Sequence, residues 1–115
     1  MIKKIKNLYQ GIKQALSGFR NKSFSVQYVE DPIDNPKKKM LYIIGTMDEP
    51  WQIEMACPCG CRDKIVLPVN NETSPRWSLN ISSDNLPSLH PSVWRSKGCK
   101  AHFFLKNGRI RWVEY

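Results

Sequence analysis

The stretch Cys57-Pro58-Cys59-Gly60-Cys61 places three thiols within five residues. Zinc prefers four ligands at the corners of a tetrahedron, and thiolates are its common structural ligands. Proline and glycine between the cysteines favour a chain that folds back, so that several sulfur atoms can converge on one point. We therefore interpret this stretch as one half of a zinc site that stabilises a small domain.

The second half of the predicted site is Gly98-Cys99-Lys100-Ala101-His102, in which Cys99 follows Cys61 after 37 intervening residues. Structural zinc sites usually draw their ligands from two separate segments of the chain. A metal bound by both segments would connect the middle of the chain to its C-terminal part and close a long loop. The two segments together predict a metal that stabilises the whole fold.

Five side chains compete for the four positions around such a zinc ion. One arrangement uses all four cysteines, Cys57, Cys59, Cys61 and Cys99, and leaves His102 free. Another uses two cysteines of the first segment together with Cys99 and His102. We favour the all-cysteine site, because four thiolates complete a structural zinc site without a histidine. A Rieske iron–sulfur cluster is less favoured because the first segment has no histidine, and metal-free buried thiols are less favoured because the cysteines are so dense.

Length and composition favour one small domain. The chain has 115 residues, of which 41% are hydrophobic, so its core is limited and a metal would help to stabilise it. No apolar run is long enough to span a bilayer, and the first six residues lack the features of a secretory signal. We therefore expect a cytoplasmic protein with no membrane partner, whose cysteines stay reduced and form no disulfides.

The net charge of +8 is unevenly distributed. Residues 1–40 carry nine basic and three acidic side chains, and the rest of the chain carries nine basic and seven acidic ones. Such a bias suits nucleic acid, an anionic membrane or an acidic protein, but it equally suits a solvated basic face. The sequence has no recognisable groove-reading helix or base-stacking motif, so nucleic acid is the least favoured partner.

The hydrophobic pattern divides the chain into a helix and a β region. Ile5, Ile12 and Leu16 belong to an apolar stripe with three- and four-residue steps, which predicts an amphipathic helix over residues 3–19. Asn107-Gly108 predicts a hairpin turn. Strands are predicted over residues 24–29, 40–45, 51–57, 64–69, 76–81, 101–106 and 109–113.

The predicted fold is therefore mainly β. We expect a basic amphipathic helix over residues 1–22, followed by a zinc-binding β domain over residues 23–115 that forms a single compact unit with it. The domain is expected to be a small antiparallel, barrel-like sheet stabilised by the metal.

Ser92 lies between the two halves of the predicted zinc site, directly after a proline. Nucleophilic serine chemistry needs a histidine base within hydrogen-bonding reach and usually a third group that orients the base. His102 is the candidate base if the metal does not bind it, and His90 is a substitute. Asp63 or Asp84 would orient the imidazole. Spacing alone supports this weakly, because a serine beside a proline is typical of a turn.

The combined motifs resemble those of a family of small bacterial proteins encoded beside ubiquitin-like conjugation genes. The resemblance covers about residues 40–113 and leaves out the basic N-terminal segment. The motifs are Cys57-Pro-Cys-Gly-Cys61, Trp77 on a strand, Pro91-Ser92, Cys99-x-x-His102-Phe103 and Asn107-Gly-Arg-Ile-Arg-Trp112.

Membership of that family would imply specific partners and an activity. The partners would be a ubiquitin-like protein and its activating and conjugating enzymes. The implied activity is that of a serine protease that removes the modifier from its targets, with Ser92 and His102 as the matching catalytic residues and the cysteines holding zinc.

Two functional hypotheses follow. In the first, the chain is a zinc-stabilised hydrolase in which Ser92 attacks a carbonyl, His102 moves the proton and backbone amides stabilise the oxyanion. In the second, it is a non-catalytic zinc module of the same pathway that binds proteins through its sheet or its basic helix. A separation of Ser92 Oγ from His102 near hydrogen-bond length would favour the first, and His102 on the metal would exclude it.

Overall fold

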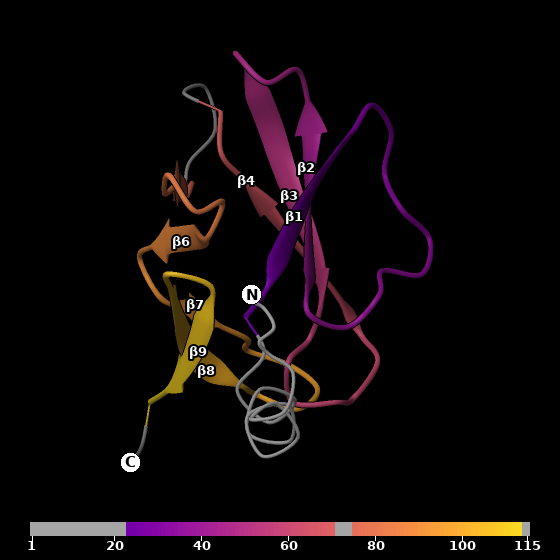
Figure 1. Cartoon of the computed structure of the whole chain (residues 1–115). Helices are drawn as coiled ribbons and strands as arrows, with labels where there is room; N and C mark the ends of the chain where they lie inside the picture. Colours follow the sequence, from indigo (N-terminus) through magenta and orange to yellow (C-terminus); the bar gives the residue numbers. More distant parts are fainter. Residues whose placement is uncertain (1–22, 71–74, 114–115) are drawn as a thin grey trace, which may run out of the picture.

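The computed structural model describes residues 23–70 and 75–113, which form an all-β fold of three small sheets (Figure 1). The predicted helix over residues 3–19 lies outside the described residues. The first sheet has the order β1 (Ser25–Val29), β2 (Met40–Gly45), β3 (Pro50–Ala56) and β4 (Lys64–Pro68). The second pairs β5 (Ser78–Ile81) with β6 (Pro87–His90), and the third has the order β7 (Val93–Trp94), β8 (His102–Lys106) and β9 (Arg109–Trp112).

Most strands lie where the sequence pattern predicts them, but two additional strands are present. β6 and β7 are short, and they flank Pro91 in a stretch that also contains Pro87. Proline cannot donate to a strand ladder, so such a stretch has the sequence pattern of a turn. Each nevertheless pairs with a strand next to it in the sequence, β6 with β5 and β7 with β8.

The expected single barrel-like antiparallel sheet needs correction. The strands form three separate small sheets, and β1 runs parallel to β2, whereas the other strand pairs in the described residues are antiparallel. A parallel neighbour requires a connection that returns to the start of the first strand. The loop of residues 30–39 makes this return alongside the first sheet (Figure 1).

A buried carboxylate on β3 holds this returning loop. Glu54 is 1% exposed and accepts hydrogen bonds from the Ile33 backbone N–H at 2.9 Å and from Gln52 Nε2 at 2.7 Å. Lys64 Nζ lies 3.2 Å from Glu54 Oε1 and donates to the Ile33 carbonyl oxygen at 2.8 Å. A buried charge is tolerated only when it is paired and hydrogen-bonded, and Glu54 meets both conditions.

We expect Glu54→Ala to lower the free energy of unfolding by about 2 kcal/mol, because it leaves the Ile33 backbone N–H without an acceptor and takes the carboxylate from the partly exposed Lys64 ammonium. Urea unfolding followed by tryptophan fluorescence measures the change. The matched control is Glu49→Ala, since Glu49 is exposed in the turn between β2 and β3. A loss below about 1 kcal/mol, typical of an exposed ion pair, would contradict this role for Glu54.

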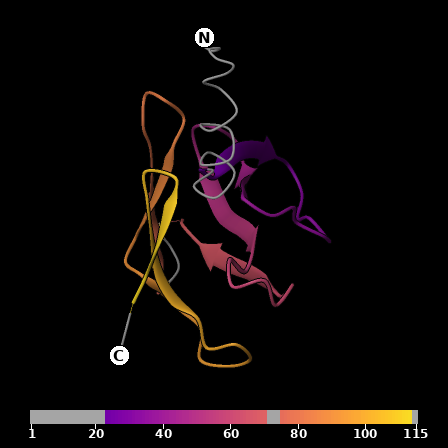
Figure 2. The same ribbon diagram turned by 60° about the horizontal axis from the view of Figure 1, so that its bottom comes forward.

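One hydrophobic core connects the sheets. Figure 2 shows β1–β4 on one side and β5–β9 on the other, and apolar side chains from both groups meet between them. Cys57 belongs to this core, so the cysteine-rich segment begins inside the protein. The core residues are Phe24, Leu41, Ile43, Ile53, Met55, Cys57, Ile65, Leu67, Leu89, Val93, Ala101, Phe103 and Leu105.

The predicted hairpin turn at Asn107-Gly108 is confirmed and also joins the layers. Both residues have positive φ, 48° and 78°, as a two-residue hairpin loop requires. The Gly108 N–H donates to the Pro87 carbonyl, and the Gly108 carbonyl accepts from the Phe24 N–H, each at 2.7 Å. A Cβ on Gly108 would lie 3.0 Å from Ser23 Cβ, so glycine suits this position for its size as well as its φ.

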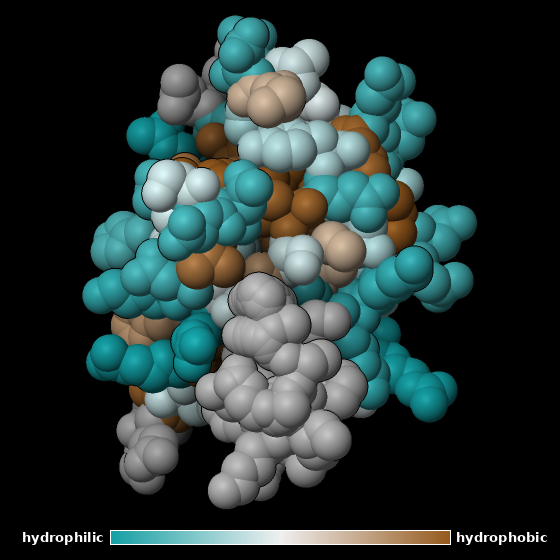
Figure 3. Space-filling view, in the orientation of Figure 1, coloured by the Kyte–Doolittle hydropathy of each residue, from teal (hydrophilic) through white to brown (hydrophobic). Residues whose placement is uncertain are grey.

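On the face shown in Figure 3, hydrophilic residues predominate over the part of the molecule that β6–β9 occupy in Figure 1. Within residues 23–70 and 75–113 there is no helix with the length and hydrophobicity that crossing a membrane requires.

Candidate functional site

Four cysteines from two distant segments form one cluster. The Sγ atoms of Cys57, Cys59, Cys61 and Cys99 all lie within 4.8 Å of one another. Cys57 Sγ lies 3.4 Å from Cys59 Sγ and 3.6 Å from Cys99 Sγ. Sulfur atoms at the corners of a tetrahedron with Zn–S bonds of about 2.3 Å are about 3.8 Å apart. The donor set and its spacing therefore fit a single tetrahedral metal ion.

The local backbone explains how three neighbouring cysteines converge. The Cys57 N–H donates to the Asp63 carbonyl at 2.9 Å, and the Gly60 N–H donates to the Cys57 carbonyl at 3.2 Å, which closes the segment into a tight loop. Gly60 has a φ of 93°, a value that side chains disfavour. The Cys61 N–H points at Cys59 Sγ from 3.3 Å, a contact that stabilises a thiolate.

Arg95 lies against the cluster and carries a charge of opposite sign to that of thiolates. Its Nη1 donates to Cys99 Sγ at 3.3 Å and to Cys61 Sγ at 3.5 Å, and its Nη2 lies 3.1 Å from Asp63 Oδ2. Four thiolates around a divalent cation leave a net charge of −2, which the guanidinium partly neutralises. Arg95 thus has the position of an outer partner of a metal centre.

Contacts among the cysteines separate their pKa values. Burial raises the pKa of Cys99, but the Ala101 backbone N–H and the neighbouring thiols outweigh it and lower this pKa to about 6. The sulfurs of Cys57 and then Cys61 raise the pKa of Cys59 to about 12. Burial raises the pKa of Cys57. A metal ion binds deprotonated thiols, so a cation held by this cluster would displace its protons.

Ser92 and His102 form a second polar group. Ser92 Oγ lies 2.8 Å from His102 Nε2. Ser92 follows the cis His90–Pro91 peptide and directly precedes β7, and His102 is the first residue of β8. The strand register places Trp94 opposite His102, so Ser92, two residues before Trp94, lies on the same face of the sheet as the imidazole. Adjacent strands therefore place the hydroxyl beside the imidazole.

Two tryptophans hold this pair. The Trp94 ring stacks on the His102 ring with centroids 4.6 Å apart and an interplanar angle of 2°, which fixes the plane of the imidazole. Trp77 Nε1 donates to the Ser92 carbonyl oxygen at 3.2 Å and so fixes the backbone of the serine. The sequence identifies Trp77 only as part of a family motif, and it gives no local signal for Trp94, whose role depends on the pairing of β7 with β8.

The alternative ligand, base and orienting acids that the sequence offered do not take those roles in the structure. The cysteine cluster does not include His102, whose Nε2 faces Ser92. Asp63 contacts Arg95 at the cluster, and Asp84 lies in the turn between β5 and β6. His90 is exposed at the end of β6. Of the predicted site residues, the structure therefore brings Ser92 together with His102 and the four cysteines with one another.

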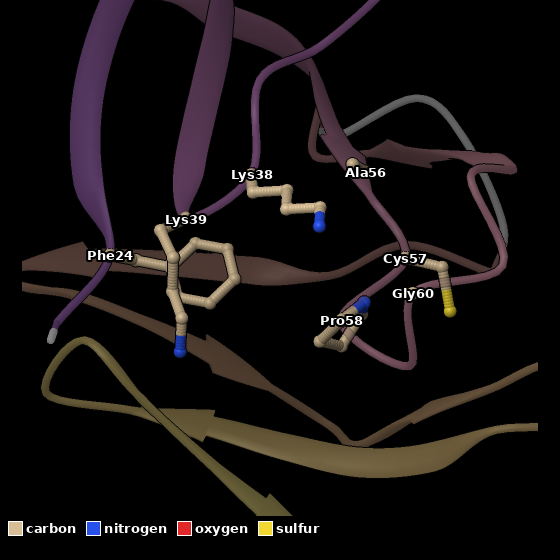
Figure 4. Close-up of a pocket in the computed structure, with 7 residues that line it drawn as sticks. All are labelled: Phe24, Lys38, Lys39, Ala56, Cys57, Pro58 and Gly60. Atoms are coloured by element: carbon tan, nitrogen blue, oxygen red, sulfur yellow. The ribbon is translucent and has the colours of Figure 1, made fainter. Parts of the chain in front are cut away.

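A small cavity of about 110 Å³ beside the cluster contains neither Ser92 nor His102. Its walls include Phe24, Lys39 and Cys57, but the Cys57 sulfur points away from Phe24 and Lys39 (Figure 4). The cavity therefore borders the cysteine cluster and lies apart from the serine–histidine pair.

Comparison with known proteins identifies a family. A family model described as the bacterial ubiquitination-like system serine protease (BubE) matches residues 27–113. The matched region contains the four clustered cysteines, Ser92 and His102. No curated protein and no solved structure matches this chain.

Proposed function

Because this chain belongs to the BubE family of bacterial ubiquitination-like system serine proteases, we propose that Ser92 is its nucleophile and His102 its general base. The observation that carries the proposal is the 2.8 Å contact between Ser92 Oγ and His102 Nε2. Serine proteases need this contact, since a serine hydroxyl is a weak nucleophile until a base removes its proton.

The reaction is acyl transfer to serine and then to water. Ser92 Oγ attacks the carbonyl carbon of the scissile amide while its proton moves to His102 Nε2. The imidazolium then gives this proton to the departing amine, which leaves an ester on Ser92. A water molecule, deprotonated by His102, hydrolyses the ester and regenerates the serine. Trp94 keeps the imidazole in one plane during both proton transfers.

The scissile bond in this proposal joins a ubiquitin-like modifier to its target. The family belongs to a ubiquitination-like system, and a protease in such a system suits the removal of the modifier. The surface supports a protein substrate, because Ser92 is only half-buried and Trp94 is 65% exposed. A protein chain can approach such an open site, whereas a closed cavity would favour a small molecule.

The cysteine cluster in this proposal holds one structural zinc ion. Four sulfur ligands complete its tetrahedron, whereas a catalytic zinc keeps a position open for water. The metal would tie the segment after β3 to Cys99, which lies three residues before His102. The site therefore stabilises the turn that leads into the histidine and takes no part in the chemical steps.

We expect a fluorophosphonate probe to form one adduct per chain, at Ser92. His102→Ala should slow labelling by about 100-fold or more, as loss of a general base does. Peptide mapping by mass spectrometry identifies the labelled residue, and His90→Ala is the matched control, because His90 is exposed and only two residues from Ser92.

Labelling of a different residue, or labelling that survives His102→Ala at the parental rate, would overturn the assignment. Loss of zinc in the His102→Ala variant would instead place this histidine on the metal.

A further inference from the structure

A groove of about 410 Å³ lies between β5, β6, β8 and β9. Its walls include His90, which is two residues before Ser92, and Phe104, Lys106 and Arg111. No step of the proposed reaction uses this groove. Its position next to the nucleophile makes it a candidate site for the part of the substrate that flanks the scissile bond.

The face of β8 that carries His102 leads into the groove. Side chains alternate along a strand, so His102, Phe104 and Lys106 share one face and follow one another at about 7 Å intervals. The alternate residues, Phe103 and Leu105, are buried in the core. Val93 pairs with Phe103, so one further step along the register brings Ser92 to the side of Phe104. An extended chain lying on this face would pass the serine and the imidazole.

The groove is bordered by positive charge. Arg111 pairs with Phe104 across the hairpin, and its Cζ lies 5.7 Å from the centroid of the Phe104 ring, which holds the guanidinium over the groove wall. Among the residues that line the groove, Lys106 and Arg111 are basic and none is acidic. A one-sided charge distribution around a binding surface favours a ligand of the opposite charge.

We propose that this groove binds an extended acidic segment of the protein substrate beside the scissile bond. Phe104 contacts an apolar side chain of the segment, and Lys106 and Arg111 pair with its carboxylates. The inference depends on the proposed function, because it takes Ser92 as the point at which the segment is cut. A nucleic acid would also be attracted by the charge, but the groove leads to a serine–histidine pair, which suits a peptide.

The test uses the full chain with Ser92→Ala and two fluorescent octapeptides, one of alternating Glu and Leu and one of alternating Lys and Leu. Fluorescence anisotropy should give a Kd for the Glu peptide about tenfold lower than for the Lys peptide, and added salt should weaken this binding. Lys106→Glu with Arg111→Glu should reverse the preference. The matched control, Lys37→Glu with Lys38→Glu, makes the same change of charge on the exposed 30–39 loop and should leave the preference intact.

Equal affinities for the two peptides would overturn the inference, as would equal effects of the two double variants. Tighter binding of a single-stranded oligonucleotide than of the Glu peptide, lost in Lys106→Glu with Arg111→Glu, would also overturn it. Fluorophosphonate labelling of Ser92 without any peptide preference would support the proposed function and reject the groove as a binding site. The expected peptide preference without any labelling of Ser92 would support the groove as a binding site and reject the proposed function.

Discussion

Replacement of Ser92 with alanine is expected to lower kcat/KM for the cleavage of a modifier–reporter fusion by about 10⁴-fold. The substitution removes the oxygen that forms the acyl intermediate, and what remains is the binding of the substrate and stabilisation of the oxyanion by the site. Because Ser92 Oγ contacts His102 Nε2 at 2.8 Å, the loss should be as large in the double variant Ser92→Ala with His102→Ala as in the single one. Such non-additivity is expected of residues that act as a unit.

The measurement needs a substrate in which the ubiquitin-like protein of the same system is fused at its C-terminus to a reporter protein. Ser96→Ala is the matched control, since it makes the same change at an exposed residue four positions away and should retain parental activity. Each variant should keep its metal and its melting temperature. Cleavage by Ser92→Ala at more than about a tenth of the parental rate would eliminate Ser92 as the nucleophile.

Replacement of Cys99 with alanine is expected to unfold the described domain at 25 °C. Structural zinc contributes about 10–16 kcal/mol in small zinc-finger peptides. The net free energy of unfolding of a typical domain is only about 5–15 kcal/mol. Cys99 is the one ligand from the second segment, so the metal-binding free energy lost with it should exceed the stability that the small core provides. Circular dichroism and the dispersion of amide NMR signals would report the loss, and metal analysis of the parent should give one zinc ion per chain.

Lys97→Ala is the control for this variant, because Lys97 is exposed in the same turn as Cys99 and is not among the clustered ligands. A Cys99→Ala protein that melts at the parental temperature would show that the cluster contributes little to folding. Iron in place of zinc, with visible absorption, would reject the assignment of the metal.

The strands that the sequence predicts are those with a local signature. β2 is a short apolar run with four consecutive buried residues, and the Asn107-Gly108 turn carries its own conformational preference. β6 and β7 have no such signature, because Pro87 and Pro91 interrupt the stretch that contains them and β7 has only two residues. The parallel pairing of β1 with β2 depends on contacts between Glu54 and the 30–39 loop, which no local pattern reveals.

The cysteine group could be predicted from spacing because thiols serve few other purposes at such density. Arg95 could not, since an arginine four residues before Cys99 has no distinguishing context until the turn brings its guanidinium to the sulfurs. The contact between Ser92 and His102 depends on the register of β7 with β8, and the stack of Trp94 on the imidazole depends on the same register. The sequence points to Ser92 and His102 but not to Trp94, and the pairing of the strands determines the geometry of all three.

The turn at Asn107-Gly108 also decides where this protein will accept foreign sequence. Hairpin tips are usually the places where epitope tags and inserted domains are tolerated. Here Gly108 at the tip donates to the Pro87 carbonyl and accepts from the Phe24 N–H. An insertion would break both hydrogen bonds and so detach this hairpin from the layer that contains β1. The turn of residues 46–49 has exposed side chains and lies on the other layer, between β2 and β3. A tag for imaging or purification therefore belongs at residues 46–49, where it would leave the hydrolytic pair and its neighbouring strands undisturbed.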